Sequence, residues 1–192
     1  MTGTRNGWDM DPGLVVRAQQ GDEAAFAAIT RALDDRFLQV AYRVLRDRHL
    51  AQDAVQQALL TIWGTLPQLR DPARFEAWSY RVLVNVCLTE TRRRTRWRTV
   101  TLTLDVPARP DDIGAVGDRD QLERAFERLS PEQRAVVVLH HYLGMSTVEV
   151  AETLDIPLGT ANSRLGRAMT TLRQALAADR PAARLSDGGS GR

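Results

Sequence analysis

Two arginines, two hydroxyls and an amide lie close together near the C-terminal end of the sequence. They are Thr160, Asn162, Ser163, Arg164 and Arg167. Small and apolar residues recur between them at a spacing typical of the inner face of an amphipathic helix: Ala161, Leu165, Ala168 and Leu172. At about 100° per residue, Thr160, Ser163, Arg164 and Arg167 then share an outward face, and Asn162 lies on the opposite flank.

The outward face of this predicted helix contains no acidic residue. Guanidinium, hydroxyl and amide groups form hydrogen bonds with phosphates and with base edges in a DNA major groove. The pattern therefore predicts a helix that contacts DNA. The structural alternative is an ordinary helical hairpin with a solvated arginine face.

A second cluster combines an aromatic ring with cations. Trp78, Arg81 and Asn85 follow each other at positions i, i+3 and i+7, which places them on one stripe of a helix. The same helix leads into a basic tract that includes Arg92, Arg93 and Arg94. Aromatic rings beside cations suit unstacked bases and backbone phosphates. A core tryptophan and a basic helix end stabilised by the helix dipole are the structural alternative.

A third group, Asp53, Gln56 and Gln57, forms a polar helix edge that by itself is typical of a solvated surface. Catalysis on nucleic acid would need a carboxylate cluster for a metal ion or a nucleophile paired with a base. The three histidines supply neither arrangement, because His140 and His141 are adjacent and face different directions on a helix. We expect no catalytic residue, no metal ion and no cofactor.

The elements that must position these residues are predicted to be helices throughout. In the N-terminal half, apolar stripes predict helices that begin near Asp11-Pro12, Gly21-Asp22, His49 and Asp71-Pro72, and Gly64 with Pro67 ends the third. The main apolar face of the fourth is expected to carry Phe75, Trp78, Val82 and Val86. Val84 and Leu88 lie on the opposite side, so this helix is expected to be buried on most sides. In the C-terminal part, capping boxes at Ser130 and Ser146 open a helix over 131–143 and a short helix to Leu154. That short helix, a turn over 155–157 and the final helix predict a helix-turn-helix.

Composition and charge limit the remaining possibilities. The chain has 192 residues, 43% of them hydrophobic, and no run long enough to span a membrane. The single cysteine, Cys87, excludes an intrachain disulfide, so a cytoplasmic location is expected. Val86 and Leu88 flank Cys87, so we expect its thiol to be buried. All 26 basic residues are arginines. Residues 81–98 hold six arginines against Glu90, a net charge of +5, whereas residues 99–121 have a net charge of −3, with two arginines against five aspartates.

We therefore expect an all-α fold of two small helical domains joined by an extended acidic linker. The predicted boundaries are 11–98 for the first domain, 99–118 for the linker, 119–177 for the second domain and 178–192 for a disordered tail. Residues 99–106 alternate polar and apolar side chains as a strand would, but no partner strand is predicted, so we expect an extended segment there.

Three segments, in order, resemble parts of the bacterial sigma-70 family of RNA polymerase sigma factors. Residues 51–63, AQDAVQQALLTIW, resemble region 2.2, and residues 75–85, FEAWSYRVLVN, with the following arginine tract, resemble regions 2.3 and 2.4. Residues 129–134, LSPEQR, together with 159–168, GTANSRLGRA, resemble region 4. The size, and the absence of other regions between these, match the extracytoplasmic-function (ECF) group.

The resemblance implies a sigma factor that binds core RNA polymerase and directs promoter-specific initiation through −10 and −35 elements. Asp53, Gln56 and Gln57 would face the β′ clamp, and region 4 would meet the β flap. The loop over 64–74 and the Trp78–Arg81–Asn85 helix would handle the −10 strand, and the predicted outward face would meet the −35 duplex. The family also admits an anti-sigma factor as a partner. The alternative function is a stand-alone helix-turn-helix regulator that does not enter the polymerase.

Overall fold

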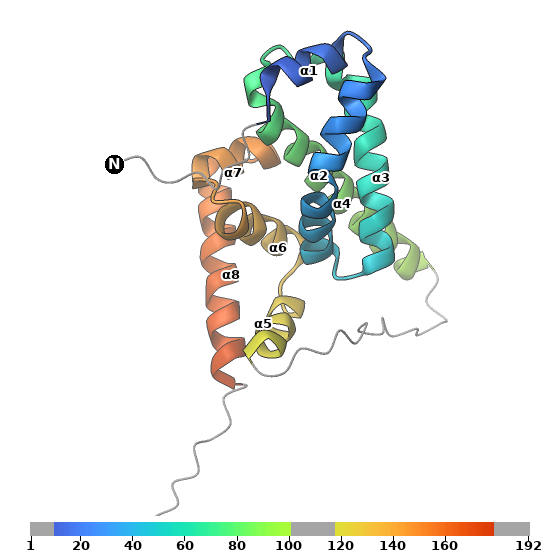
Figure 1. The fold of residues 1–192 in the computed structure, drawn as a ribbon. Coiled ribbons are helices and arrows are strands. Elements are labelled where there is room, and N and C mark those ends of the chain that lie inside the picture. The colour runs from blue at the N-terminus through green and yellow to red at the C-terminus, as the bar shows by residue number, and fades with distance from the viewer. Residues whose placement is uncertain (1–9, 101–117, 179–192) are drawn as a thin grey trace, which may run out of the picture.

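The computed structural model describes residues 10–100 and 118–178 (Figure 1). The N-terminal part is built from four helices: α1 (Pro12–Gln19), α2 (Glu23–Leu45), α3 (Arg48–Thr65) and α4 (Phe75–Val100). Two 3₁₀ turns, η1 (Leu66–Gln68) and η2 (Pro72–Arg74), connect α3 to α4. The described residues contain no strand, which confirms the all-α class. None of the described helices combines the length and the hydrophobicity needed to cross a bilayer.

Aspartates begin the first three helices, as the sequence pattern predicts for α1 and α2. The carboxylates of Asp11, Asp22 and Asp47 accept hydrogen bonds from the backbone N–H groups of Gly13, Ala25 and Leu50. Each bond satisfies a donor that the first helical turn leaves unpaired, and the negative charge suits the positive end of the helix dipole. Local side-chain chemistry therefore determines where the three helices start.

The C-terminal part contains α5 (Asp118–Glu127), α6 (Pro131–Val137), η3 (Val138–Tyr142), α7 (Thr147–Leu154) and α8 (Leu158–Ala178). Both predicted capping boxes are present: Ser130 pairs with Gln133, and Ser146 pairs with Glu149. The predicted single helix over 131–143 instead changes from α to π geometry at Val138. The chain leaves this helix at Gly144, whose φ of +72° is a conformation that glycine adopts without a steric penalty.

α4 is buried on more than one side, as predicted, and Val84 and Leu88 opposite its main apolar face are both buried. Phe75 is buried as predicted, but Leu83, Val84 and Cys87 are the fully buried residues of the helix middle. Trp78, Val82 and Val86, which were expected on the main apolar face, are only partly buried and pack at the edge of the core. The reason is that α4 is covered on more than one side, by α2 and α3 and also by α6 and α7.

One hydrophobic core runs through both parts of the chain. It joins Phe37 of α2 and Leu83 of α4 with Val136 of α6, Leu139 of η3 and Leu154 of α7. Figure 1 shows α6 and α7 between the long α8 and the bundle of α2, α3 and α4. A smaller cluster holds α5 to α8 through Ala125, Leu129, Val137, Ala168, Leu172 and Ala175. The two helical units are thus packed against each other, an arrangement that the sequence did not predict.

Several predicted boundaries move by a turn or less. The third helix continues past Gly64 to Thr65, and Pro67 lies in the following 3₁₀ turn. Asp71-Pro72 opens a 3₁₀ turn that leads directly into α4. Thr99 and Val100 are helical, so the predicted extended segment cannot begin at residue 99. The rest of the predicted linker and the predicted disordered tail after residue 178 lie outside the described residues.

Candidate nucleic-acid interface

The predicted helix-turn-helix is formed by α7, the turn over 155–157 and α8. Asp155 ends α7 in the left-handed conformation with φ of +53°, and its N–H donates back to the carbonyls of Ala151 and Glu152. The first turn of α8 is then set by the Pro157 carbonyl, which accepts from the N–H groups of Thr160 and Ala161. These bonds fix the angle at which α8 leaves α7.

The face of α8 carries the polar residues predicted from the sequence. Asn162, Ser163 and Arg167 are exposed, while Thr160 and Arg164 are partly buried. Of the predicted inner residues, Ala161, Ala168 and Leu172 are buried and Leu165 is partly buried. Nε of Arg167 donates to the backbone carbonyl of Ser163 at 3.2 Å, so this side chain lies along the helix surface. The guanidinium is thereby held on the exposed side of the helix.

Arg81, in the Trp78–Arg81–Asn85 stripe of α4, contacts the helix-turn-helix. The Trp78 ring lies 5.9 Å from the Phe75 ring and is partly buried, while Arg81 and Asn85 are exposed. Arg81 forms an ion pair with Asp155, the residue that ends α7, at 3.5 Å. The structure thus brings together a predicted DNA-contacting residue and an acidic residue that the sequence had not marked. No periodicity signal could have identified this pair, because the two residues are far apart in the chain.

The basic tract lies at the far end of α4, with Arg92, Arg93 and Arg94 all exposed. Arg93 pairs with Glu90 at 3.0 Å, and Arg94 pairs with Asp47 at 3.0 Å. Partial burial raises the pKa of Asp47, but hydrogen bonds from the Leu50 N–H and from Arg94 outweigh this and bring the pKa below its ordinary value. Asp47 therefore stays ionised and anchors Arg94 to the start of α3.

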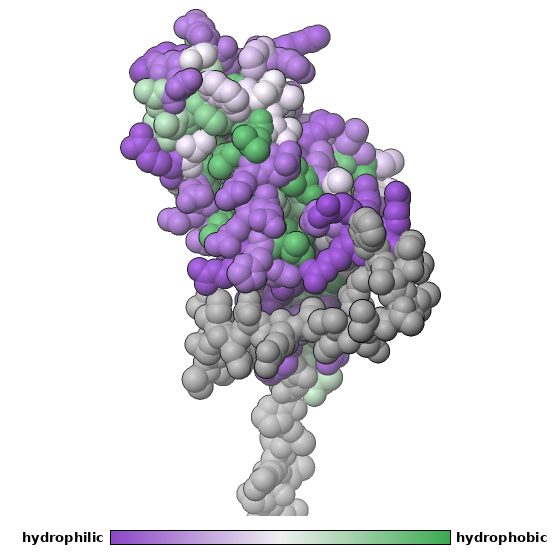
Figure 2. Space-filling view, turned by 90° about the vertical axis from the view of Figure 1, so that its right-hand side faces the viewer, coloured by the Kyte–Doolittle hydropathy of each residue, from purple (hydrophilic) through white to green (hydrophobic). Residues whose placement is uncertain are grey.

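The predicted polar edge of α3 is on the surface. Asp53, Gln56 and Gln57 are all exposed. One turn further on, Leu60 is 68% exposed and extends this edge with apolar area, a feature that the sequence analysis did not single out. Figure 2, which views the molecule from the α3 side of Figure 1, shows mostly hydrophilic side chains with separate hydrophobic patches between them.

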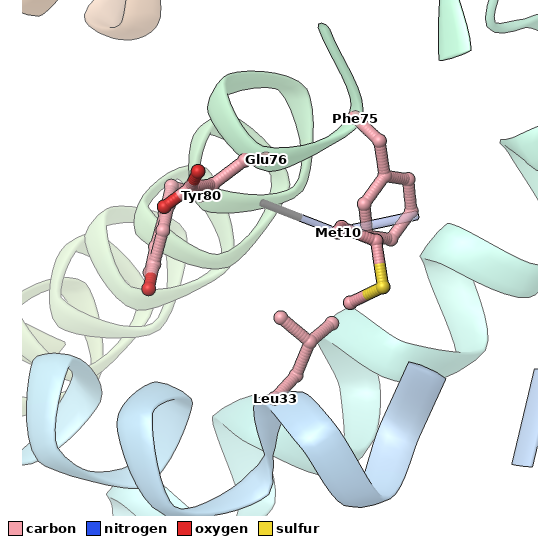
Figure 3. A pocket seen from close by; sticks show the side chains of 5 residues that line it. All are labelled: Met10, Leu33, Phe75, Glu76 and Tyr80. Atoms are coloured by element: carbon pink, nitrogen blue, oxygen red, sulfur yellow. The ribbon is translucent and has the colours of Figure 1, made fainter. Parts of the chain in front are cut away.

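The interior formed by the described residues contains a small, largely apolar pocket. Figure 3 shows a small pocket in which the Met10 side chain lies between Leu33 and the Phe75 ring, with Glu76 and Tyr80 beside them. Burial raises the pKa of Tyr80 to about 12. Burial also raises the pKa of the Cys87 thiol to about 12, which agrees with the prediction of a buried thiol. Within residues 10–100 and 118–178, no cluster of histidine, cysteine and carboxylate side chains has the composition of a metal site.

Comparison with known proteins assigns both helical units. The family model "Sigma-70 region 2" matches residues 29–98, and the model "Sigma-70, region 4" matches residues 119–172. The protein is thus of the sigma-70 class, with two sigma regions on one chain.

Whole-chain relatives narrow the assignment. The chain is 37% identical to the ECF RNA polymerase sigma factor SigL of Mycobacterium tuberculosis, and the alignment covers 81% of this chain and 93% of SigL. It is 34% identical to the RNA polymerase sigma-E factor of Streptomyces coelicolor, over 82% of this chain and 89% of that protein. The chain therefore belongs to the ECF group of RNA polymerase sigma factors, which are initiation factors and not enzymes.

Solved structures agree with this family. CnrH in complex with the cytosolic domain of CnrY is 25% identical, with a TM-score of 0.63 over 88% of this chain and 98% of that chain. The sigma factor RpoE from Bartonella quintana, solved with the anti-sigma factor NepR, is 23% identical, with a TM-score of 0.66 over 81% of this chain and 98% of that one. The second similarity concerns the fold alone.

Proposed function

We propose that this sigma factor binds core RNA polymerase and directs initiation at promoters that carry −10 and −35 elements. The observation that carries the proposal is the presence of both sigma regions on one chain, each with an exposed polar face of the required chemistry. Arginines are the only basic side chains of the protein, and their planar forks suit bidentate contacts to phosphates and to guanine.

Each exposed face receives one role in this proposal. The α8 residues Thr160, Asn162, Ser163, Arg164 and Arg167 contact the −35 duplex in its major groove. The α4 residues Trp78, Arg81 and Asn85, with Arg92, Arg93 and Arg94, contact the −10 strand. Asp53, Gln56 and Gln57 on α3 contact the β′ clamp of the polymerase, and region 4 contacts the β flap. Most of these side chains are exposed, while Trp78, Thr160 and Arg164 are partly buried, and this accessibility supports the assignment.

An anti-sigma factor is proposed as a further partner. Support comes from CnrH, which was solved with the cytosolic domain of CnrY and aligns with 88% of this chain. A partner of this kind would compete with core polymerase for the same sigma surfaces. Adding such a protein to the transcription assay described next would then reduce initiation.

The test is run-off transcription from a genomic template library, with and without core polymerase. Specific transcripts should require both the sigma factor and the core enzyme. Alone, the protein should bind duplex DNA weakly, because a small helix-turn-helix makes few phosphate contacts, and added salt should weaken this binding further. Tight, specific promoter binding without core polymerase would instead support a stand-alone helix-turn-helix regulator.

A further inference from the structure

The first turns of α8 have two flanks of different chemistry. Arg164 and Arg167 lie on one flank, while Leu158 and Asn162 follow each other at i and i+4 on the other. Leu158 and Asn162 are both exposed, and neither side chain is charged. Figure 1 shows α8 along the outer edge of the molecule, where both flanks can meet a partner. Leu158 and Asn162 together are called the neutral flank of α8 below.

Small residues separate the two flanks. Gly159 and Gly166 are exposed, and a Cβ atom added at either position would meet no atom within 4 Å. Between them, the Ser163 hydroxyl donates back to the Thr160 carbonyl at 3.0 Å, so it lies against its own helix. The middle of this face therefore carries only short side chains, which allows the backbone of α8 to come close to base edges.

The amide of Asn162 is available for an external partner. Its neighbours on the helix surface are the residues three and four positions away: Leu158, Gly159, Leu165 and Gly166. None of these four has a polar side chain, and within the described part of the chain no hydrogen bond engages the Asn162 side chain. A carboxamide has an acceptor oxygen and a donor nitrogen side by side. This pattern matches the N6 donor and the N7 acceptor of adenine in the major groove.

Leu158 adds an apolar group at the start of the same flank. Its side chain is 44% exposed although it is the first residue of α8, the part of a recognition helix that contacts base edges. The C5 methyl group of thymine is the apolar feature of a major-groove edge, and apolar side chains contact it. Leu158 therefore suits a thymine that lies beside the adenine bound by Asn162.

We propose that the neutral flank makes the −35 contact selective for neighbouring A·T base pairs. Asn162 accepts a hydrogen bond from N6 of an adenine and donates one to its N7, and Leu158 covers the methyl group of an adjacent thymine. The inference rests on the proposed function, which places α8 in the major groove of the −35 duplex. It adds Leu158 as a specificity-determining residue, and it leaves phosphate and guanine contacts to the arginine flank.

The first experiment is run-off transcription with core polymerase from a template pool in which the −35 element is randomised and the −10 element is fixed. The unmodified protein should select A·T pairs at two neighbouring positions. Asn162→Ala should reduce the preference for the adenine by about 5-fold. Leu158→Ala should reduce the preference for the neighbouring thymine by about 3-fold, the size expected for one buried methyl group.

Two matched controls remove the same kind of side chain elsewhere. Gln174→Ala removes an exposed amide further along α8, and Leu122→Ala removes a leucine of α5 that is 45% exposed. Both controls should retain the base preferences of the unmodified protein. Circular dichroism of each variant verifies that it is folded.

The second experiment changes single groups of the DNA, so the effect on the unmodified protein needs no variant. Replacing the selected adenine by 7-deazaadenine removes the N7 acceptor, and replacing the selected thymine by uracil removes the methyl group. Both replacements keep Watson–Crick pairing. Initiation by the unmodified protein should fall by about 5-fold and about 3-fold. The first effect should be absent with Asn162→Ala, and the second should be absent with Leu158→Ala.

The outcomes separate this inference from the proposed function. An unchanged preference profile for Asn162→Ala or for Leu158→Ala would overturn the role of that residue. Selection of G·C pairs at the affected positions would overturn the inference, as would equal sensitivity of the unmodified protein and Asn162→Ala to 7-deazaadenine. Core-dependent initiation persists in each of these outcomes, so the proposed function would stand. Absence of core-dependent transcripts from every template would instead overturn the proposed function, and this inference with it.

Discussion

At the scale of single residues, Arg164 and Arg167 differ in their surroundings although they share one helix face. Arg167 is exposed and held along the helix by the Ser163 carbonyl, whereas Arg164 is partly buried at the same end of α8. The sequence analysis placed both outward, since 3.6-residue periodicity fixes only the direction of each side chain. How much of a side chain its neighbours cover depends on tertiary packing.

We predict that Arg164→Ala and Arg167→Ala each reduce initiation from promoters that depend on the −35 element. An arginine contact to a base edge contributes about 1–3 kcal/mol of discrimination, so a reduction of about 5-fold or more is expected for a base-reading residue. Initiation should be largely retained where an extended −10 element replaces the −35 element. Run-off transcription on paired templates measures both.

The control for these variants is Arg173→Ala, an exposed arginine further along α8. Its loss should affect both templates little. Melting temperatures should stay near that of the unmodified protein for all three variants. Normal transcription of the −35-dependent template by both Arg164→Ala and Arg167→Ala would contradict the assignment of this face to DNA.

Cys87 leads to a second prediction at this scale. The thiol is fully buried, so a reagent in solvent cannot reach it in the folded chain. Burial also raises its pKa to about 12, so only a small fraction is the reactive thiolate at pH 8. An aromatic disulfide reagent should label the native chain at least ~100-fold more slowly than the urea-unfolded chain. A cysteine introduced at the exposed position Gln174 provides the comparison. Fast labelling of native Cys87 would instead indicate a redox-accessible thiol.

At the scale of elements, the exposed edge of α3 can be tested without disturbing its core-facing side. Ala54, Val55 and Ala58 are buried, whereas Asp53 and Gln56 point to solvent. Asp53→Arg/Gln56→Ala should therefore weaken binding to core polymerase by at least ~10-fold. The reversed charge at position 53 would leave the polymerase group that pairs with Asp53 without its partner, or next to a like charge. Competition binding against the unmodified protein measures this effect.

Asp34→Arg on α2 serves as the charge-reversal control for the α3 variant, because Asp34 is also exposed. Circular dichroism should give the same helix content for all three proteins. A folded α3 variant with unchanged core affinity would remove this edge from the polymerase interface.

Local signals explain why some elements could be predicted and others could not. The capping boxes at Ser130 and Ser146 depend on side chains three residues apart, so the sequence contains the complete information for these helix starts. The π segment over 138–142 has no such signal. In it the Leu143 N–H bonds to the Val138 carbonyl, five residues earlier, and Tyr142 reaches Gln39 and Arg43 of α2. Its geometry accompanies a contact with a helix about 100 residues away in the chain.

At the scale of the whole molecule, the shared core predicts cooperative unfolding. Since one apolar cluster includes residues of both regions, neither region can unfold without exposing apolar surface of the other. Calorimetry of the free protein should therefore give a single transition with equal calorimetric and van't Hoff enthalpies. Two separate transitions would show that the regions are thermodynamically independent and that their contact is weak.

The sequence by itself determined the class of protein, the helical composition and the polar faces of α3, α4 and α8. These features depend on residue type, on helical periodicity and on caps, all of which act over a few positions of the chain. Only the tertiary structure decided how the faces are arranged. The pairing of Arg81 with Asp155 and the common core of the two regions join residues more than 70 positions apart. Such contacts form when apolar faces of separate helices exclude water together, and no local pattern records which faces will meet.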